Sequence, residues 1–492
     1  MQTNLPRPPI VTILGHVDHG KTTLLDYIRK SSIAAKEHGA ITQKIGAYEI
    51  STDIKGYNTN KITFIDTPGH EAFSLLRSRG TNVADIAVLV IDAKDSVMPQ
   101  TVESISHIKS ANIPFIVAVN KIDLPEANPE KVKNDLIKQG ILVEGKGGGV
   151  PVVLISAKTG SGVSELKEAV LLIASDLNLQ YSPNNNPKAL IIETKKDKRG
   201  LVISAIIKDG KLKIGDFIQS DQKHAKVRSI LNDLGKSVNE VVPSTPFELL
   251  GFDALPDVGS TITIQSEFGK TSKTISVDVA KNLTIPQTVD LDSLLNPKIE
   301  NKKLSLIIKA DSQGSLEAVC QSLATNDNIK FVLKSIGDIH KSDIFLAKST
   351  RSIIVGFSVA VSDDARELAK QEKIIIKTYN IIYQLLDELE EVAGLLIEKQ
   401  QKERNLKGSA KILATFIIEN KKVFGIKITK GKINLGDELD VLRGDKLIGK
   451  TKIISLKIRA KTVSEVKKDQ EAGILMEPQL DIRIGDVVKC SL

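Results

Sequence analysis

The sequence predicts a multidomain protein of the α/β plus β class, with an α/β domain, a β-barrel, an α/β/α sandwich, a long connecting helix and a second β-barrel. Three observations predict this class. The first 180 residues alternate apolar strand-like runs with helical stretches, a short motif recurs 221 residues later, and a helical apolar stripe lies between the two copies. At 492 residues the chain is also too long for one core, because single hydrophobic cores stop growing near about 250 to 300 residues.

We expect the first domain to span residues 1–180. Its apolar runs have the length of buried strands and are separated by helical stretches, a pattern typical of a parallel sheet covered by helices on both faces. The runs are Val11–Leu14, Ile62–Ile65, Ile86–Ile91, Phe115–Val119 and Val152–Ile155. The polar stretch Pro183–Pro187 then predicts a linker, since nothing in it favours burial.

An internal repeat predicts two β-barrels of one type, over residues 187–270 and 407–492. The stretch Gly210–Asp216, GKLKIGD, recurs as Gly431–Asp437, GKINLGD. Both copies are rich in short alternating strands with glycine turns, as small barrels are. Chance similarity between short glycine turns is the alternative explanation.

Between the barrels we expect a linker over residues 271–302, an α/β/α sandwich over 303–379 and a connecting helix over 380–405. Apolar residues keep helical spacing along that helix, at Ile382, Leu385, Leu389 and further positions. The stripe allows two interpretations: a rigid arm that joins the sandwich to the last barrel, or a helix that packs on the sandwich.

Composition excludes several classes of protein. With 41% hydrophobic and 26% charged residues, the chain is neither disordered nor fibrous. No apolar run approaches the roughly 18 residues of a membrane span. The two cysteines, Cys320 and Cys490, cannot form a disulfide framework or a spaced zinc site, so we expect a reducing cytoplasm and no membrane.

The net charge of +8 is concentrated at the end of the chain. Residues 407–492 carry 18 Lys and Arg against 11 Asp and Glu, whereas the preceding 406 residues are nearly neutral. A basic excess on one domain is the electrostatic signature of binding to phosphates. A lysine-rich surface that serves only solubility is the alternative.

The residues Gly15–Thr22, GHVDHGKT, match the phosphate-binding loop pattern G-x-x-x-x-G-K-[ST] between a strand and a helix. In such a P-loop, backbone N–H groups converge on the phosphates, the lysine reaches the β and γ phosphates, and the hydroxyl faces Mg²⁺. The pattern predicts a nucleotide site but does not choose between ATP and GTP. The binding residues that we predict here are Asp18, His19, Gly20, Lys21, Thr22 and Thr23.

A second motif, Asn120–Asp123, predicts guanine. The carboxylate of Asp123 can accept from guanine N1–H and the amino group together, whereas adenine offers no donor at that edge. We expect Asn120 to brace the loop and the Lys121 stem to lie along the base, while Ser156, Ala157 and Lys158 supply a backbone donor for the guanine oxygen. The predicted ligands are therefore GTP and GDP.

A third motif, Asp66–His70, ends a strand on the same edge of the sheet. We expect Asp66 to hold Mg²⁺ through a water molecule and the N–H of Gly69 to face the γ-phosphate. His70 stands where other GTPases place a glutamine that orients water, so it is the predicted catalytic residue. Thr42, in the loop stretch Gly39–Gln43, is a further predicted Mg²⁺ ligand beside Thr22.

Together with the predicted order of domains, these residues resemble the bacterial translation initiation factor 2 family. The stretches Ile41–Ala47, ITQKIGA, and Val97–Thr101, VMPQT, add to the resemblance, which covers nearly all of the chain. Elongation factors share the phosphate loop and the Pro-Gly-His turn but lack a sandwich between two barrels. The order of domains therefore favours initiation over elongation.

The resemblance implies a P-loop GTPase domain and a function in initiation. Such a factor promotes binding of initiator formylmethionyl-tRNA to the small ribosomal subunit and subunit joining, and hydrolyses GTP on the assembled ribosome. The implied partners are both ribosomal subunits with their RNA, initiator tRNA and other initiation factors. The implied protein is a monomer and a short form without the N-terminal extension of many members.

The resemblance also implies that the last barrel holds the end of initiator tRNA. The residues that match this pocket are Phe416, Lys457, Arg459, Lys461, Glu471 and Gly473. Family members often carry cysteines at Ile426 and Ala472 and an acidic pair at Lys461 and Thr462, and Gly39-Ala40 replaces Gly-Gly. These departures motivate an alternative: a ribosome-associated GTP switch that joins subunits without selective delivery of tRNA. A P-loop kinase or ATPase is a third hypothesis, which Asp123 disfavours.

Overall fold

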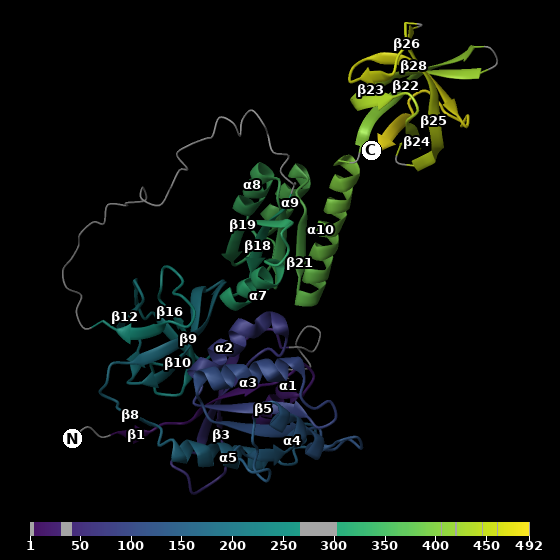
Figure 1. Ribbon diagram of the computed structural model, residues 1–492. Helices are drawn as coiled ribbons and strands as arrows, with labels where there is room; N and C mark the ends of the chain where they lie inside the picture. Colours follow the sequence, from purple (N-terminus) through teal and green to yellow (C-terminus); the bar gives the residue numbers. More distant parts are fainter. Residues whose placement is uncertain are drawn as a thin grey trace, which may run out of the picture. The chain divides into compact units, whose positions relative to one another are not determined.

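The computed structural model describes residues 4–30, 42–265, 303–404, 406–418, 421–444, 446–459 and 461–491. The chain divides into two compact units, one of Met1–Leu295 with Leu304–Leu389, the other of Asn296–Lys303 with Glu390–Leu492. The predicted linker 271–302 lies outside the described residues, as do Gly39–Ile41 and residues 266–270 of the predicted first barrel. The predicted fold class is confirmed, and Figure 1 shows the α/β domain, the barrels and the sandwich.

The first domain is built on a six-stranded sheet of order β3-β4-β2-β5-β6-β7. All neighbours in it pair in parallel except β3, which is antiparallel to β4. Every residue of β2 and β5 is buried, as expected for apolar strands covered on both faces. Parallel strands bring their carboxyl ends to one edge, and loops at that edge form the ligand site in such folds. The strands are β2 (Ile10–Leu14), β3 (Gly46–Ser51), β4 (Lys61–Asp66), β5 (Ile86–Asp92), β6 (Phe115–Asn120) and β7 (Val152–Leu154).

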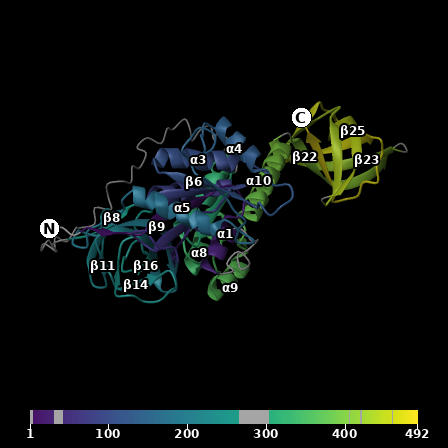
Figure 2. The same cartoon turned by 90° about the horizontal axis from the view of Figure 1, so that it is seen from below.

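Helices cover both faces of this sheet, as Figure 2 shows for α3 and α4 on one side and α1 and α5 on the other. The buried side chains of these helices belong to two separate apolar clusters, one for each face. A short antiparallel pair, β1 (Leu5–Pro6) with β8 (Gln180–Tyr181), joins the ends of the domain. The helices are α1 (Lys21–Arg29), η2 (Glu71–Phe73), α2 (Ser74–Val83), α3 (Pro99–Ala111), α4 (Pro129–Lys138) and α5 (Val163–Asp176).

The first barrel is an antiparallel sheet of order β13-β12-β17-β9-β10-β16-β14, with a separate pair β11–β15. Its core consists of inward-facing aliphatic residues such as Ile203, Ala205 and Ile207, which alternate along β10 and are fully buried. The strands are β9 (Lys188–Asp197), β10 (Gly200–Asp209), β11 (Leu212–Lys213), β12 (Phe217–Ser220), β13 (Lys223–Lys226), β14 (Ser229–Asn232), β15 (Glu240–Val241), β16 (Pro246–Leu250) and β17 (Thr261–Ile264).

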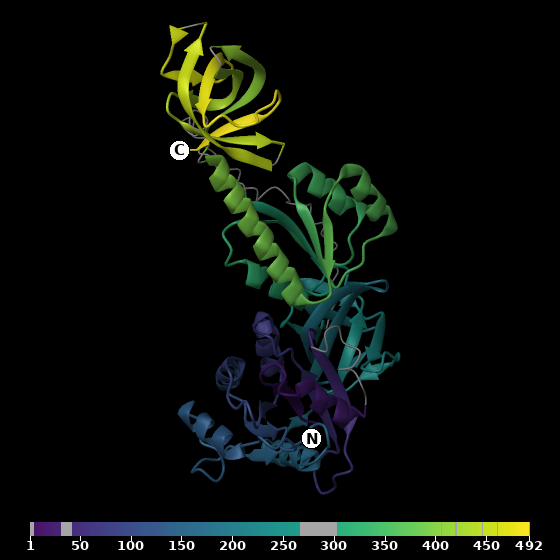
Figure 3. The same ribbon diagram turned by 90° about the vertical axis from the view of Figure 1, so that its right-hand side faces the viewer.

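The last barrel has the order β22-β29-β24-β25-β28-β23, and a pairing of β22 with β23 closes the ring. The yellow part of Figure 3 shows these strands wrapped into a barrel. Its core includes Phe424, Ile426 and Leu456, each at most 1% exposed. The strands are β22 (Leu406–Ile418), β23 (Lys421–Asn434), β24 (Glu438–Arg443), β25 (Lys446–Ile458), β26 (Lys461–Thr462), β27 (Glu465–Lys467), β28 (Glu471–Glu477) and β29 (Val487–Ser491).

The sandwich is a parallel sheet of order β19-β18-β20-β21 flanked by helices. Helices α8 and α9 pack on one face through residues such as Ile344 and Ala365, which share a cluster with Ile307 and Ile354 of the sheet. The elements are β18 (Leu304–Ala310), α7 (Gln313–Leu323), β19 (Ile329–Ile336), α8 (Lys341–Thr350), β20 (Ile353–Phe357), α9 (Asp363–Glu372) and β21 (Ile376–Tyr379).

The connecting helix α10 spans Ile382–Arg404. In its first two turns Ile382, Leu385 and Leu389 are buried, as the packing interpretation expects for this part of the stripe. The rigid-arm interpretation stays a prediction. Among the described helices, none is both long and apolar enough to cross a membrane.

A buried carboxylate joins the first barrel to the sandwich. Glu193 of β9 accepts hydrogen bonds from the hydroxyl of Ser312 at 3.0 Å and the N–H of Gly314 at 3.1 Å, at the start of α7. Burial raises the pKa of Glu193, against the lowering effect of these bonds. Anions are favoured at helix N-termini, because the first backbone N–H groups lack partners within the helix. Glu193 therefore fixes the first turn of α7 on the barrel.

Candidate nucleotide site

The phosphate-binding loop connects β2 to α1 through backbone that requires glycine. Gly15 has φ 142°, and a Cβ there would lie 2.3 Å from the Val90 carbonyl oxygen. Gly20 has φ 87°, and a Cβ there would lie 2.4 Å from the side-chain nitrogen of Asn120. Any larger residue would therefore displace the backbone of β5 at the first position or the side chain of Asn120, at the end of β6, at the second. The remaining turn is made by Asp18, which itself adopts a positive φ of 62°.

Lys21 is the first residue of α1, and its side chain is buried. Its ammonium group donates to the carbonyl oxygen of His16 at 2.5 Å, across the loop. Burial lowers the pKa of Lys21 to about 8, with Asp66 raising it and Arg77 lowering it. The ammonium is thus mostly charged at pH 7 but poorly solvated, a state that favours binding of an anion.

Asn120 ties the phosphate loop to the loop after β7. Its side-chain nitrogen donates to the carbonyl oxygen of His19 at 2.8 Å, and its oxygen accepts from the N–H of Ala157 at 2.9 Å. Nearby, the hydroxyl of Ser156 donates to Asp123 at 2.7 Å and holds the pKa of that carboxyl below its usual value. The Asp123 carboxyl is exposed and ionised, so it can accept hydrogen bonds from two donors on the same edge of one ligand.

Two predicted residues differ in detail from the expectation. The Lys121 ammonium pairs with Asp92 at 2.7 Å, an acidic partner at the end of β5 that the motif does not reveal. The imidazole of His19 is buried, and burial followed by the charges of His16 and Lys21 lowers its pKa to about 4. His19 therefore takes part in the loop through its backbone carbonyl, while its neutral ring packs inward.

A cavity of about 290 Å³ lies at this edge of the sheet. It brings together residues of all three motifs and adds Val17 and Tyr383. Among the predicted residues, those that line it are Asp18, Gly20, Lys21, Thr22, Thr23, Thr42, Gly69, His70 and Lys121. The other predicted residues do not line this cavity: His19, Asp66, Asn120, Asp123, Ser156, Ala157 and Lys158.

His70 lies on the cavity wall in a defined orientation. Its Nδ1 accepts from the N–H of Ala72 at 3.0 Å, and its ring stacks on Tyr383 of α10 with centroids 3.9 Å apart. Burial, then the charge of Arg77, lowers the pKa of His70 to about 4. The ring is therefore neutral at pH 7, with its hydrogen on Nε2. Tyr383 comes from a distant part of the sequence, and no local motif could have predicted it.

The hydroxyls predicted to face Mg²⁺ lie together. The Oγ1 atoms of Thr22 and Thr42 are 2.6 Å apart, beside the cavity. Asp66, at the end of β4, is buried, and its charge is close enough to Lys21 to raise the pKa of the lysine. Hydroxyl, carboxylate and phosphate oxygens are the ligands that Mg²⁺ prefers, so this set of donors suits the ion.

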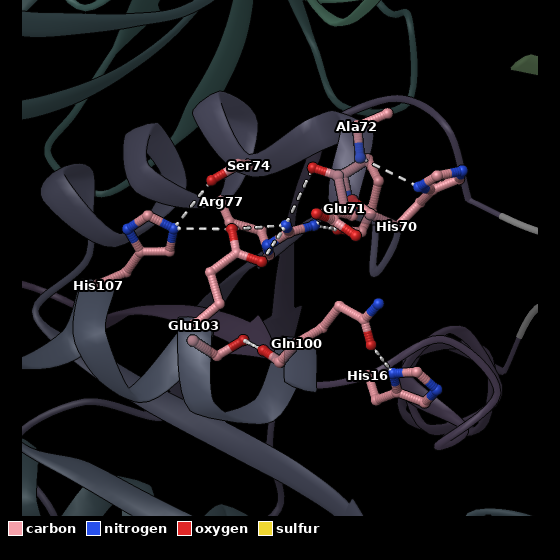
Figure 4. A network of polar contacts seen from close by, with 11 residues as sticks. His16, His70, Glu71, Ala72, Ser74, Arg77, Gln100, Glu103 and His107 are labelled. Carbon is pink, nitrogen blue, oxygen red and sulfur yellow. Dashed lines mark hydrogen bonds and ion pairs between the residues drawn. The ribbon is translucent and has the colours of Figure 1, made fainter. Parts of the chain in front are cut away.

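A buried arginine supports the loop that carries His70, as Figure 4 shows. The Arg77 side chain of α2 is fully buried and donates to the carbonyl oxygens of Pro68 at 2.9 Å and His70 at 2.5 Å. Both oxygens of Glu103, on α3, accept from the same guanidinium at 2.7 Å. Burial raises the pKa of Glu103, but hydrogen bonds from His107, Arg77 and Ser74 outweigh it and lower that pKa to about 2. Sequence reasoning missed this arginine, for which the only signal is a charge on the inner face of an amphipathic helix.

The last barrel has a second cavity, of about 660 Å³. Five of the six residues predicted for the tRNA pocket line it, and Lys461 lies on the short strand β26 outside it. Ile426 and Ala472 also line the cavity and face each other in the register of β23 and β28. The five predicted residues are Phe416, Lys457, Arg459, Glu471 and Gly473.

Three family models match the chain. The elongation factor Tu GTP binding domain matches residues 7–176, elongation factor G domain 2 matches 186–265, and translation-initiation factor 2 matches 280–390. The last match begins inside the range 271–302 predicted as a linker. The fold, the site and these matches define a chain that carries the GTP-binding domain of translational GTPases.

Several similar proteins indicate to which family within this class the chain belongs. Translation initiation factor IF-2 of Halothermothrix orenii is 41% identical over 496 residues, which cover 98% of this chain and 71% of that protein. The chain belongs to the translation initiation factor IF-2 family. The same factors of Bartonella tribocorum and Aquifex aeolicus are each 41% identical over 99% of this chain, which spans 59% and 61% of their length. The crystal structure of GDP-bound aIF5B from Aeropyrum pernix aligns with a TM-score of 0.48 and 26% identity, over 99% of this chain and 92% of that one.

Proposed function

We propose that this protein acts in the cytoplasm as an initiation factor: it binds GTP, promotes binding of initiator formylmethionyl-tRNA to the small ribosomal subunit and subunit joining, and hydrolyses GTP on the assembled ribosome. One observation carries the proposal. Residues from the three nucleotide motifs meet at one edge of the sheet in a chain whose family is initiation factor IF-2. Other initiation factors and ribosomal RNA are further proposed partners.

In this proposal Lys21 and the backbone N–H groups of the loop hold the phosphates, and Asp123 selects the guanine base. Asn120 supports both, since it bonds to the carbonyl of His19 and the N–H of Ala157. Adenine would leave the Asp123 carboxylate without donors, and sites built on such pairing reject the wrong ligand by as much as about 10⁴ to 10⁵.

Thr22 and Thr42 would hold Mg²⁺ directly and Asp66 through a water molecule. The bound ion supplies positive charge that neutralises the phosphate oxygens during transfer. The hydroxyl pair at 2.6 Å supports this assignment, because two oxygen donors already converge beside Lys21.

His70 would orient the water that attacks the γ-phosphate. With Nδ1 engaged by the N–H of Ala72, the hydrogen on Nε2 is available, and Nε2 is buried without a hydrogen-bond partner among the described residues. Water would then form a new bond to the γ-phosphorus while the bond to the β–γ bridging oxygen breaks and leaves its electron pair on GDP; the proton of the water would pass to a phosphate oxygen, which gives GDP and inorganic phosphate. Hydrolysis by the free protein should be slow, since trans-acting groups in other GTPases contribute about 10³ to 10⁵ in rate.

A single-turnover experiment tests this function. We expect ribosomes to accelerate GTP hydrolysis by about 10³ or more, and His70→Ala to remove the acceleration while GTP still binds. Asp123→Ala serves as the matched variant that loses the preference for GTP over ATP. Equal rates with and without ribosomes would contradict the proposal.

In the last barrel, Lys457 and Arg459 would bind the phosphates of initiator tRNA, and the cavity would hold its aminoacyl end. The net charge of +7 over residues 407–492 supports this role, because RNA affinity depends strongly on such charge. The sixth predicted residue, Lys461, would contact the tRNA backbone outside the cavity.

A specific observation favours the second candidate, a subunit-joining switch without selective tRNA delivery. Ile426 and Ala472 face each other on the cavity wall, where family members often carry cysteines. Filter binding of formylated against unformylated methionyl-tRNA separates the candidates. Preference for the formylated form supports the delivery function, whereas equal retention of both forms supports the switch alone.

A further inference from the structure

A continuous set of hydrogen bonds links the loop of His70 to the interior of the GTPase domain. The Arg77 guanidinium contacts three successive parts of this loop, with the carbonyl oxygen of Glu71 at 3.5 Å in addition to those of Pro68 and His70. These carbonyls belong to the residue before Gly69, to His70 itself and to the residue after it. One rigid planar group, the guanidinium of Arg77, therefore fixes the backbone of this loop (Figure 4).

The guanidinium of Arg77 is in turn fixed by an acidic partner. Glu103 accepts from it with both oxygens, and His107 lies 3.2 Å from the same carboxylate and 3.3 Å from the Ser74 hydroxyl. Buried charges persist only when they are paired and hydrogen-bonded. Glu103 compensates the charge of Arg77 and, from α3, determines where the guanidinium stands.

Arg77 does not line the nucleotide cavity. Arg77 contacts the backbone of a loop that contributes Gly69 and His70 to that cavity, and the N–H of Ala72, two residues after His70, orients the His70 ring. A displacement of about 1 Å in a reacting group can lower a rate by about 10²-fold.

We propose that Arg77, anchored by Glu103, is a positioning residue for GTP hydrolysis that fixes Gly69 and His70 against the γ-phosphate. The proposal rests on the proposed hydrolysis through His70. It assigns to the α2–α3 pair a role in catalysis that differs from the binding of nucleotide. The alternative is a buried arginine that only stabilises the fold.

Arg77→Lys is the informative change, because lysine keeps the charge but cannot make the forked contacts with three carbonyls and a carboxylate. In single turnover with ribosomes we expect its rate to fall about 10²-fold, while affinity for a fluorescent GTP analogue stays within about twofold. Glu103→Gln should show a smaller fall of the same kind. Arg79→Lys is the matched control, since Arg79 lies on the same helix but pairs with Glu317 of the sandwich; its rate should stay at the wild-type value.

A double variant separates positioning from mere stabilisation. If Arg77 acts through His70, the Arg77→Lys change should slow the His70→Ala protein no further. The inference would be overturned if the rate losses of Arg77→Lys and His70→Ala multiply in the double variant. It would also be overturned if Arg77→Lys alone hydrolyses GTP at the wild-type rate, or if its affinity for nucleotide falls in parallel with its rate. A wild-type protein that hydrolyses no GTP on ribosomes would instead overturn the proposed function, and this inference with it.

Discussion

The two barrels have the same strand order except at one position, where the last barrel has one long strand and the first has two short ones. In the last barrel β25 pairs with both β24 and β28, and Lys452 is the register partner of Glu438 on one side and Glu477 on the other. The first barrel has two short strands, β13 and β14, in place of this long strand. If these two are joined, the strand orders become identical, and even the pair β11–β15 has its counterpart in β23–β27.

The difference shows which features are needed for the fold and which serve a site. The shared parts are the turns: Gly210 and Gly431 have φ 69° and 67°, while Asp216 and Asp437 each accept a backbone N–H three residues upstream. The charge differs, with 18 Lys and Arg against 11 Asp and Glu in residues 407–492, and 12 against 10 in residues 188–264. The cavity of about 660 Å³ is lined by the last barrel's own residues, whereas residues of the first barrel line cavities of about 280 and 530 Å³ together with residues of neighbouring domains.

The largest expected effect tests whether the shared glycine turn is essential in both barrels. A Cβ at Gly431 would lie 2.2 Å from the Lys407 carbonyl oxygen, and one at Gly210 would lie 2.4 Å from that of Asn185. We expect Gly431→Ala and Gly210→Ala each to destabilise their own barrel by about 3 kcal/mol, since positive φ and overpacking each cost about 1 to 3 kcal/mol. Hydrogen exchange of the full-length chain, resolved by peptide, measures both.

The matched controls are the next glycines in each turn, Gly436 and Gly215, which have φ 90° and 97° and open space around a Cβ. Their change to alanine should cost only about 1 kcal/mol. Controls as damaging as the test variants, or a loss that spreads equally to the other barrel, would show that the two turns are not equivalent.

A smaller effect should separate the two aspartates. The carboxylate of Asp437 accepts from the N–H of Asn434 at 2.8 Å and also pairs with Lys407 at 2.5 Å, whereas the carboxylate of Asp216 accepts from the N–H of Lys213 at 2.7 Å. Asparagine keeps an acceptor oxygen for the N–H in both barrels but removes the charge that pairs with Lys407, and hydrogen bonds to charged groups contribute about 1.5 to 3 kcal/mol against about 1 for neutral ones. Asp437→Asn should therefore destabilise its barrel by about 2 kcal/mol and Asp216→Asn by about half as much, read by the same exchange experiment.

The Asp437 effect should also depend on pH. Burial raises its pKa, but hydrogen bonds, from Lys407 above all, bring the pKa below its usual value. A carboxyl whose folded pKa is lowered contributes stability above its unfolded pKa of about 4 and loses it as the pH falls through the folded value. The deficit of Asp437→Asn should thus be constant from pH 8 to 5 and shrink below pH 4. A deficit that persists in acid would assign the effect to packing instead.

Local motifs were sufficient for the fold class and for the residues around the nucleotide cavity, because glycines, the P-loop lysine and the ends of apolar strands determine the local backbone. They were insufficient where a partner comes from a distant segment. The pairing of Lys121 with Asp92, the stacking of Tyr383 on His70 and the contacts of Arg77 are tertiary, and no spacing along the chain encodes them. The turn repeat predicted two barrels of one type, but it did not predict that one long strand, β25, stands in the last barrel where the first has β13 and β14.

The side chain of Asn120 bonds at one end to the phosphate loop and at the other to the loop beside Asp123. The two loops are therefore held in a fixed relative position before any ligand binds. A nucleobase and a polyphosphate that bind weakly as separate fragments would, once covalently joined, bind at a high effective concentration, because little of their combined affinity is lost in aligning the two halves. In the proposed site, one amide would thus couple selection of the base to binding of the phosphates.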